Sequence, residues 1–265
     1  MFLIRFFIGG LVGRIIMLAV VVAIVAGAGW WFFIRDNASL ATSAPDIPAS
    51  VKQGSTPSSS AVPASGTPTD SASGTPSAGS TTAAAPAGVT VYNIVANQSQ
   101  AAYFAGEKLA SLPLPSTAEG KTADISGHFA LKADGLDTAN TSAFTVNLAS
   151  LKSDKDMRDG RVKQALQTST YPTTTFTATK LTGWPATFPE GTEVDMQLTG
   201  TMDLHGVKKD VTWDVKAKKE GSGFSLLATV TFPYSDFNIS KPNIAGFVTV
   251  DNTVTLQVQL VAQAA

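Results

Sequence analysis

The chain has 265 residues, with 19 Lys and Arg against 20 Asp and Glu, a formal net charge of −1, and no cysteine. This balance, without a basic stripe, argues against a nucleic-acid partner. The absence of cysteine excludes disulfides, thiolate metal sites and a cysteine nucleophile. Composition divides the chain into a membrane-like segment, residues 1–36, a low-complexity segment, 37–88, and a globular segment, 89–265.

The membrane-like segment contains 20 consecutive apolar or glycine residues, from Ile15 to Ile34. As a helix this run covers about 30 Å, the thickness of the bilayer hydrocarbon. Arg5 and Arg14 precede it, which predicts a cytoplasmic N-terminus and an extracytoplasmic C-terminal domain. A cleaved signal peptide is the alternative. The length of the apolar run favours a retained single-pass anchor in the cell membrane at residues 15–34.

The low-complexity segment is dominated by Ser, Ala, Thr, Pro and Gly, and it has no aromatic residue. Such a composition buries too little apolar area to offset the chain entropy lost on folding. Residues 37–88 are therefore predicted to be a disordered, flexible linker, with a mean span of roughly 40 Å as a random coil.

The globular segment shows apolar and polar residues in alternation, which is typical of β-strands with one buried face. The clearest example is Val194–Leu204, where every even-numbered residue is apolar or glycine. It is followed by His205-Gly206-Val207 and a second alternating run at Val211–Lys218, which together predict a hairpin. Further strands are predicted at Tyr92–Ala96, Ala101–Ala105, Ile125–Leu131, Ala143–Leu151, Thr173–Leu181, Phe224–Phe232 and Phe247–Ala262, the last with a break at Asp251-Asn252.

Two segments of the globular part depart from alternation. Leu109–Pro115 is predicted to be a proline-bearing loop, either a lid or a plain surface insertion. Ser153–Thr168 is predicted to contain one short helix, capped by Asp154 or Ser153. For the charged cluster at 154–161 we expect local salt bridges at the helix start rather than a catalytic pair of carboxylates.

These elements predict an all-β fold with about eight or more strands and one short helix. Because no βαβ unit is present, the sheet is expected to be antiparallel. An eight-stranded closed barrel satisfies the pattern, and a sandwich is the other solution.

The sequence offers little catalytic chemistry. By alternation, His128 and His205 are both expected to face solvent rather than the apolar interior. No nucleophile elbow, glycine-rich phosphate loop or His-Glu-x-x-His motif is present. We therefore expect no catalytic residue, no metal site and no cofactor, and we expect the protein not to be an enzyme.

One ordered series of residues resembles a known family. Ser150-Leu151, Asp154, Met157-Arg158-Asp159, Tyr171-Pro172, Phe176 and the run from Leu198 to Val211 are similar in order and spacing to the YceI family. The resemblance covers roughly residues 89–262. It implies a lipocalin-like antiparallel barrel, exported in bacteria, that holds a polyisoprenoid or another long-chain amphiphile. It also implies that His205-Gly206-Val207 is a strand-end turn and that Arg158-Asp159 opens a helix beside the barrel.

The function expected from these observations depends on whether the barrel is hollow. Alternation alone favours a solid core, whereas the resemblance implies a cavity for a polyisoprenoid, an isoprenoid quinone or a fatty-acid-like lipid. The alternative is a surface-displayed interaction module with a filled barrel and no ligand; a hydrolase is a third hypothesis. A homodimer stays open as the assembly. The predicted apolar lining is Phe144, Val146, Leu148, Phe176, Met196, Leu198, Met202, Leu204, Trp213, Phe224, Leu226 and Phe232.

Overall fold

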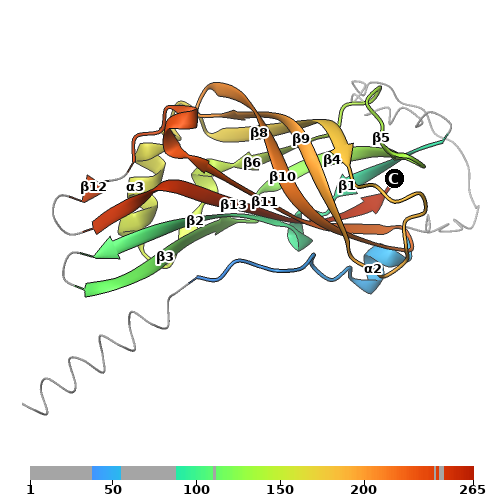
Figure 1. Cartoon of the computed structure of the whole chain (residues 1–265), viewed down its shortest axis with the longest axis horizontal. Helices are drawn as coiled ribbons and strands as arrows, with labels where there is room; N and C mark the ends of the chain where they lie inside the picture. Colours follow the sequence, from blue (N-terminus) through green and yellow to red (C-terminus); the bar gives the residue numbers. More distant parts are fainter. Residues whose placement is uncertain (1–37, 55–87, 110–111, 242, 245–247) are drawn as a thin grey trace, which may run out of the picture.

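The computed structural model describes residues 38–54, 88–109, 112–241, 243–244 and 248–265. Most of these residues are in β-strands (Figure 1). The strands are β1 Val89–Ile94, β2 Gln100–Leu109, β3 Leu112–Thr122, β4 Ile125–Lys132, β5 Gly135–Leu136, β6 Ala143–Asn147, β7 Lys152–Ser153, β8 Thr173–Thr182, β9 Val194–Leu204, β10 Val207–Glu220, β11 Gly223–Pro233, β12 Asn243–Ile244 and β13 Val248–Ala264. The α-helices are α2 Ala49–Lys52 and α3 Asp156–Ala165, and the 3-10 helices are η1 Ala96–Gln98, η2 Leu148–Ser150 and η3 Tyr234–Phe237.

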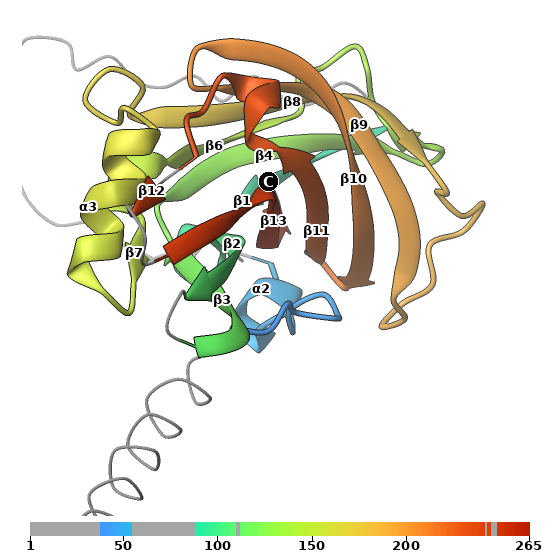
Figure 2. The same ribbon diagram turned by 60° about the vertical axis from the view of Figure 1, so that its left-hand side comes forward.

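Eight strands form a closed antiparallel barrel. They follow one another around the barrel in the order β1, β4, β6, β8, β9, β10, β11 and β13, and pairing of β13 with β1 closes the ring (Figure 2). The predicted all-β, eight-stranded antiparallel barrel is therefore confirmed, and the sandwich is excluded. Because the ring is closed, each of these eight strands has a neighbouring strand on both sides.

Strand β13 has two different neighbours along one of its edges. Its C-terminal end pairs with β1, whereas residues 248–259 pair with β2. The hairpin of β2 and β3 thus extends the wall beyond the closed ring, and the short β7 pairs with β3. The predicted break at Asp251-Asn252 is a register shift between Val250 and Val254 within one continuous strand. A shift of this kind bends a strand without ending it.

The expected loop at Leu109–Pro115 is wrong, because β3 begins at Leu112 and pairs with β2. Prolines lack the N–H needed in the middle of a sheet. They are accommodated here because the other edge of β3 pairs only at Gly120 and Lys121, with β7, so residues 112–119 form an edge. The sequence therefore contains a longer β2–β3 hairpin than the prolines suggested.

The single ten-residue helix lies where the sequence placed it, but its cap differs. The N-cap residue of α3 is Lys155, whose side chain makes no capping bond, so neither Asp154 nor Ser153 caps the helix. Instead Asp159, in the first turn, reaches back and accepts bonds from the backbone N–H and the hydroxyl of Ser153, both at 2.7 Å. The local salt bridges expected in this cluster are present at Asp154 and Arg158.

Residues 38–54, which we call the strap, lie against the outside of the barrel rather than extending as a free linker (Figure 1). Ile47 and Val51 are 3% and 5% exposed and pack on Val261 of β13. The structure therefore differs from the linker prediction at 38–54; residues 55–87 lie outside the described residues. Among the described helices none is long and apolar enough to cross a membrane, and the predicted anchor at 15–34 also lies outside the described residues.

Candidate functional site

The interior of the barrel is filled by aromatic side chains from its middle to the end near α2. Phe144, Phe176 and Trp213 form one cluster, with ring centroids 5.4–6.2 Å apart. Phe224 joins a second cluster, with Trp184 at 6.3 Å and further aromatic neighbours. Phe176 and Trp213 are only 1% and 2% exposed. This part of the barrel is a solid core.

The other end of the barrel, beside α3, is hollow. It holds a cavity of about 950 Å³, which lies within the size range of small-molecule pockets. Phe232 lines the cavity, whereas Phe224 lies in the solid core eight residues earlier on β11, a separation of about 26 Å along the strand. The remaining apolar lining residues are Ala38, Ala105, Ala118, Leu148, Leu151, Met157, Val162, Ala165, Leu166, Leu204, Ile239, Val248, Val250, Val254 and Leu256.

The hollow forms because the β2–β3 hairpin turns small residues inward. Ala105 lies opposite Ala118 in the register, and Tyr103 lies opposite Gly120. A Cβ at Gly120 would lie 2.3 Å from Cε1 of Tyr103, so only glycine leaves room for the tyrosine ring. Where the far end of the barrel carries Phe and Trp, this wall carries Ala and Gly, and the difference in side-chain volume leaves the space.

Two tyrosines, Tyr103 and Tyr234, are among the polar residues that line the cavity. The hydroxyl of Tyr103 is buried and has no hydrogen-bond partner in the part of the chain that the structure describes. Burial raises the pKa of Tyr103 well above its ordinary value, and burial also raises the pKa of Tyr234 to about 12. Both phenols therefore stay protonated at physiological pH and can donate a hydrogen bond. A buried donor without a partner is costly, so the Tyr103 hydroxyl is available to donate a hydrogen bond to an acceptor inside the cavity.

Charged side chains surround the cavity on the α3 side. Arg158 lies 3.3 Å from Glu107 of β2 and also pairs with Asp154. Burial would lower the pKa of Arg158, but Glu107 and Asp154 together raise it above its ordinary value, so the guanidinium stays charged. This ion pair joins the helix to the β2–β3 hairpin and places charge next to the mouth of an apolar cavity.

The start of α3 is held in place by Asp159, which is 6% exposed. Burial opposes its charged form, but the Ser153 hydrogen bonds and Lys152, at 3.3 Å, outweigh burial and lower the pKa of Asp159. Asp159 therefore remains ionised and fixes the helix that covers this side of the cavity.

The structure places all twelve predicted lining residues in the buried core, so their inward orientation is confirmed. Only Leu148, Leu204 and Phe232 also line the cavity. Their contact with a ligand stays a prediction. The other nine pack in the core outside the cavity lining: Phe144, Val146, Phe176, Met196, Leu198, Met202, Trp213, Phe224 and Leu226.

The prediction missed several cavity residues, and Tyr103 is the most informative of them. The predicted strand Ala101–Ala105 contains no polar residue, so the parity rule does not decide whether Tyr103 or Phe104 faces the cavity. Glu107 and Arg158 gave no signal either, because their pairing depends on how α3 packs against β2.

The expectation that both histidines face solvent is wrong for His205, which is 9% exposed. Its φ of +55° begins the turn between β9 and β10 and takes the side chain out of the strand alternation. Its Nδ1 lies 3.1 Å from the carbonyl oxygen of Phe237, and its ring meets the ring of Tyr171 edge-on, with centroids 5.0 Å apart. His128 is half-buried, and neither histidine lines the cavity. Among the described residues, no three His, Asp or Glu side chains come together as metal ligands.

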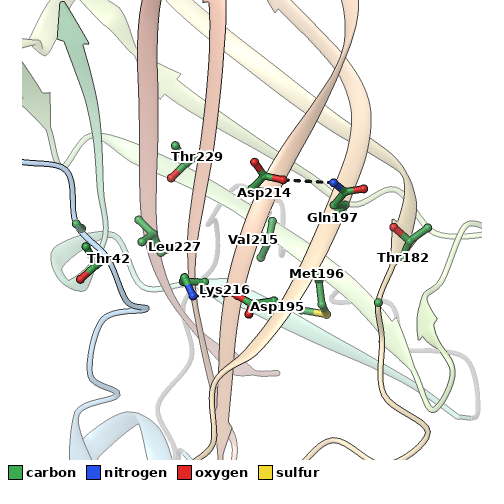
Figure 3. A pocket seen from close by; sticks show the side chains of 12 residues that line it. Thr42, Thr182, Asp195, Met196, Gln197, Asp214, Val215, Lys216, Leu227 and Thr229 are labelled. Atoms are coloured by element: carbon green, nitrogen blue, oxygen red, sulfur yellow. Dashed lines mark hydrogen bonds and ion pairs between the residues drawn. The ribbon is translucent and has the colours of Figure 1, made fainter.

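A second, smaller cavity of about 550 Å³ lies outside the barrel, between the strap and strands β9–β11 (Figure 3). Its lining mixes apolar side chains with paired polar groups: Lys216 pairs with Asp195 at 2.9 Å, and Gln197 donates to Asp214 at 3.4 Å. These paired groups make it a poor site for an apolar ligand. The cavity beside α3 is therefore the candidate binding site.

Comparisons with known proteins agree with this architecture. A YceI-like domain matches residues 92–262. A polyisoprenoid-binding domain from Saccharophagus degradans is similar in structure, with 18% identity and a TM-score of 0.52 over 66% of this chain and 98% of that domain. BcnA from Burkholderia cenocepacia has 19% identity and a TM-score of 0.49 over 64% of this chain and 99% of its own. A YceI protein from Campylobacter jejuni has 22% identity and a TM-score of 0.42 over 54% and 83%. Among curated proteins, no relative matches.

Proposed function

Because the chain belongs to the YceI family, we propose that it is an exported, membrane-tethered binding protein for a long-chain amphiphile. The ligand class is a polyisoprenoid, an isoprenoid quinone or a fatty-acid-like lipid, held in the cavity beside α3. The similar domain from Saccharophagus degradans is described as polyisoprenoid binding, and the shared fold makes the same class a candidate here.

The observation that carries this proposal is the apolar cavity of about 950 Å³ at one end of an otherwise solid barrel. A filled barrel would serve the alternative, an interaction module without a ligand. Removing a lipid chain from water stabilises the complex by about 0.8 kcal/mol for each buried methylene, before the cost of ordering the chain. The Tyr103 hydroxyl, buried without a partner, gives this apolar site one hydrogen bond to offer to a headgroup.

The test is to identify the lipid that the protein carries. Full-length protein is purified from cells, placed in nanodiscs of a single synthetic phospholipid, and extracted with organic solvent for mass spectrometry. We expect a long-chain species other than the nanodisc phospholipid, in near-stoichiometric amount.

The matched variants are Ala118→Phe and Ala118→Ser. Ala118 is 3% exposed and lines the cavity, so phenylalanine would fill the space, whereas serine changes the volume little. We expect the lipid to be lost with phenylalanine and kept with serine. A clean extract from the unmodified protein, and no uptake on later incubation with lipids, would favour the filled interaction module.

The tether and the export are tested separately. We expect immunoblots to find the full-length chain in the membrane fraction, and a protease added to intact spheroplasts to degrade the barrel. The support for this part is the apolar run from Ile15 to Ile34 and the arginines before it. Full-length protein in the soluble fraction would overturn the anchor.

A further inference from the structure

We propose that the α3 end of the barrel docks on an anionic lipid bilayer, so that the mouth of the cavity opens at the headgroups. The strap holds the barrel in this orientation. This inference rests on the proposed function, because it requires residues 15–34 to lie in the membrane. The proposed function is thereby extended: the α3 end is the surface that contacts the bilayer, and a lipid enters the cavity from that side.

Hydrogen bonds and an ion pair fix the strap to the barrel along its length. The side chain of Gln257 accepts from the N–H of Ala41 at 2.9 Å and donates to the carbonyl oxygen of Ala41 at 3.0 Å. The N–H of Ala44 donates to Glu193 at 2.7 Å, and Asp46 pairs with Lys218 at 3.2 Å. The barrel is therefore bound to the chain before residues 55–87, and that stretch cannot act as a spacer between the membrane and the barrel.

The mouth of the cavity lies only a short length of chain away from the predicted anchor. Ala38 lines the same cavity as the residues of α3, so the strap begins at the mouth. Only residues 35–37 separate Ala38 from the end of the predicted anchor at Ile34. At full extension these few residues reach about 14 Å. The mouth is thus held close to the bilayer, instead of about 40 Å away as a free linker of 52 residues would allow.

The α3 end of the barrel exposes large hydrophobic side chains. Met157 on α3 is 86% exposed, and Leu40, two residues after Ala38, is 45% exposed. They are the exposed large hydrophobic residues among those described; Met157 lines the cavity, and Leu40 is close in sequence to Ala38, which also lines it. Exposed apolar side chains beside cations are typical of surfaces that enter the membrane interface.

The α3 end of the barrel also carries a net positive charge. The segment 152–166, which contains β7 and α3, has five Lys and Arg against three Asp. Arg161 follows Met157 by one helical turn, is exposed, and has no ion pair within the described residues. A net positive surface of this kind is attracted to anionic headgroups.

The opposite end of the barrel has different charges. Near the turn between β10 and β11, four lysines face five carboxylates, and every one of these lysines is paired. That end is net negative, so an anionic bilayer would repel it. The lysines are Lys52, Lys216, Lys218 and Lys219, and the carboxylates are those of Asp46, Glu190, Glu193, Asp195 and Glu220.

The experiment uses the absence of cysteine, which permits single labels. Gln164→Cys places a fluorophore on α3, seven residues after Met157 and on the same helical face. Thr192→Cys places the matched label near the net-negative end, and both positions are exposed. Full-length protein is put into nanodiscs of phosphatidylcholine with phosphatidylglycerol and a small fraction of a nickel-chelating lipid, which quenches fluorophores near the headgroups.

We expect several-fold stronger quenching at position 164 than at 192. Arg161→Glu together with Met157→Ser should reduce the quenching at 164 toward that at 192, with the circular dichroism spectrum unchanged. Replacing phosphatidylglycerol by phosphatidylcholine should weaken the contrast. Equal quenching at the two positions, stronger quenching at 192, or failure of the chain to enter the nanodisc would overturn the proposal. Because no cargo lipid is measured, the quenching contrast can fail while the extraction experiment succeeds; failure to enter the nanodisc would count against the anchor of the proposed function as well.

Discussion

Gln257→Ala tests whether the strap is held by the side chain that contacts its first residues. Gln257 is 4% exposed and exchanges two hydrogen bonds with the backbone of Ala41. Each neutral bond contributes about 1 kcal/mol, so their loss should destabilise the docked strap by about 2 kcal/mol. Since 1.4 kcal/mol corresponds to a factor of ten, amide exchange at Ala41 should become about 30-fold faster.

The measurement is hydrogen exchange of the full-length chain in nanodiscs, with mass spectrometry of peptides that cover the strap. The effect should be local, because Ile47 and Val51 remain packed on Val261 at the other end of the strap. Peptides around Val51 should keep their protection. Gln259→Ala is the matched control, since Gln259 lies two residues later on β13 and bonds to no strap residue among those described.

Two outcomes would refute this reasoning. If exchange at Ala41 were already at the rate of an unstructured peptide in the unmodified protein, the strap would not be docked in solution. If Gln257→Ala and Gln259→Ala behaved alike, the strap would be held by its apolar end alone, and the Gln257 contacts would contribute nothing measurable.

Three further predictions concern the barrel. Leu198→Glu, at a position 6% exposed, should lower the free energy of unfolding by about 4 kcal/mol in urea titrations, because it buries a carboxyl group without a partner. Gly120→Ala should cost about 2 kcal/mol by clashing with the ring of Tyr103, and Tyr103→Leu should restore part of that loss in thermal melts. Asp159 has a lowered pKa in the folded protein, so its contribution to stability is present above its ordinary pKa of 3.8 and is lost as the pH falls through the lower folded value. Asp159→Asn should therefore destabilise the protein at pH 7 and have a smaller effect at pH 2.

Each of these predictions has a contradicting result. Full stability of Leu198→Glu would mean that the inward face of β9 is assigned to the wrong parity. Gly120→Ala without cost would mean that the tyrosine ring moves freely in the cavity. Equal effects of Asp159→Asn at the two pH values would mean that the carboxylate does not gain stability from its charge.

Alternation predicted the direction of side chains well, because the strand period of two is a local property of the backbone. Val194–Leu204 is a strand with the predicted bounds, and Met196, Leu198 and Met202 all face inward. Alternation carries no information about depth along the barrel. Trp213 and Phe232 both face inward, yet one is in the solid core and the other lines the cavity.

The failures have specific physical causes. The parity rule fails at His205 because a left-handed residue in the turn interrupts the strand geometry. The strap was missed because a Ser-, Ala- and Pro-rich composition is typical of disorder, while its docking depends on the few apolar contacts made by Ile47 and Val51. Those contacts are made with Val261, which is more than 200 residues away in the sequence.

The fold has two parts with different roles, the solid aromatic core and the hollow end beside α3. The solid aromatic core is built from strands of the closed ring, so it supplies stability whatever the ligand. The hollow depends on the β2–β3 hairpin, the bulged start of β13 and α3, which lie beyond the fully closed part of the ring. Ala105, Ala118 and Gly120 set the width there, and Phe232 and Leu204 also line the cavity. Substitutions at Ala105 and Ala118 are therefore expected to change the proposed ligand binding at less cost to the barrel than substitutions in the aromatic core, which change stability first.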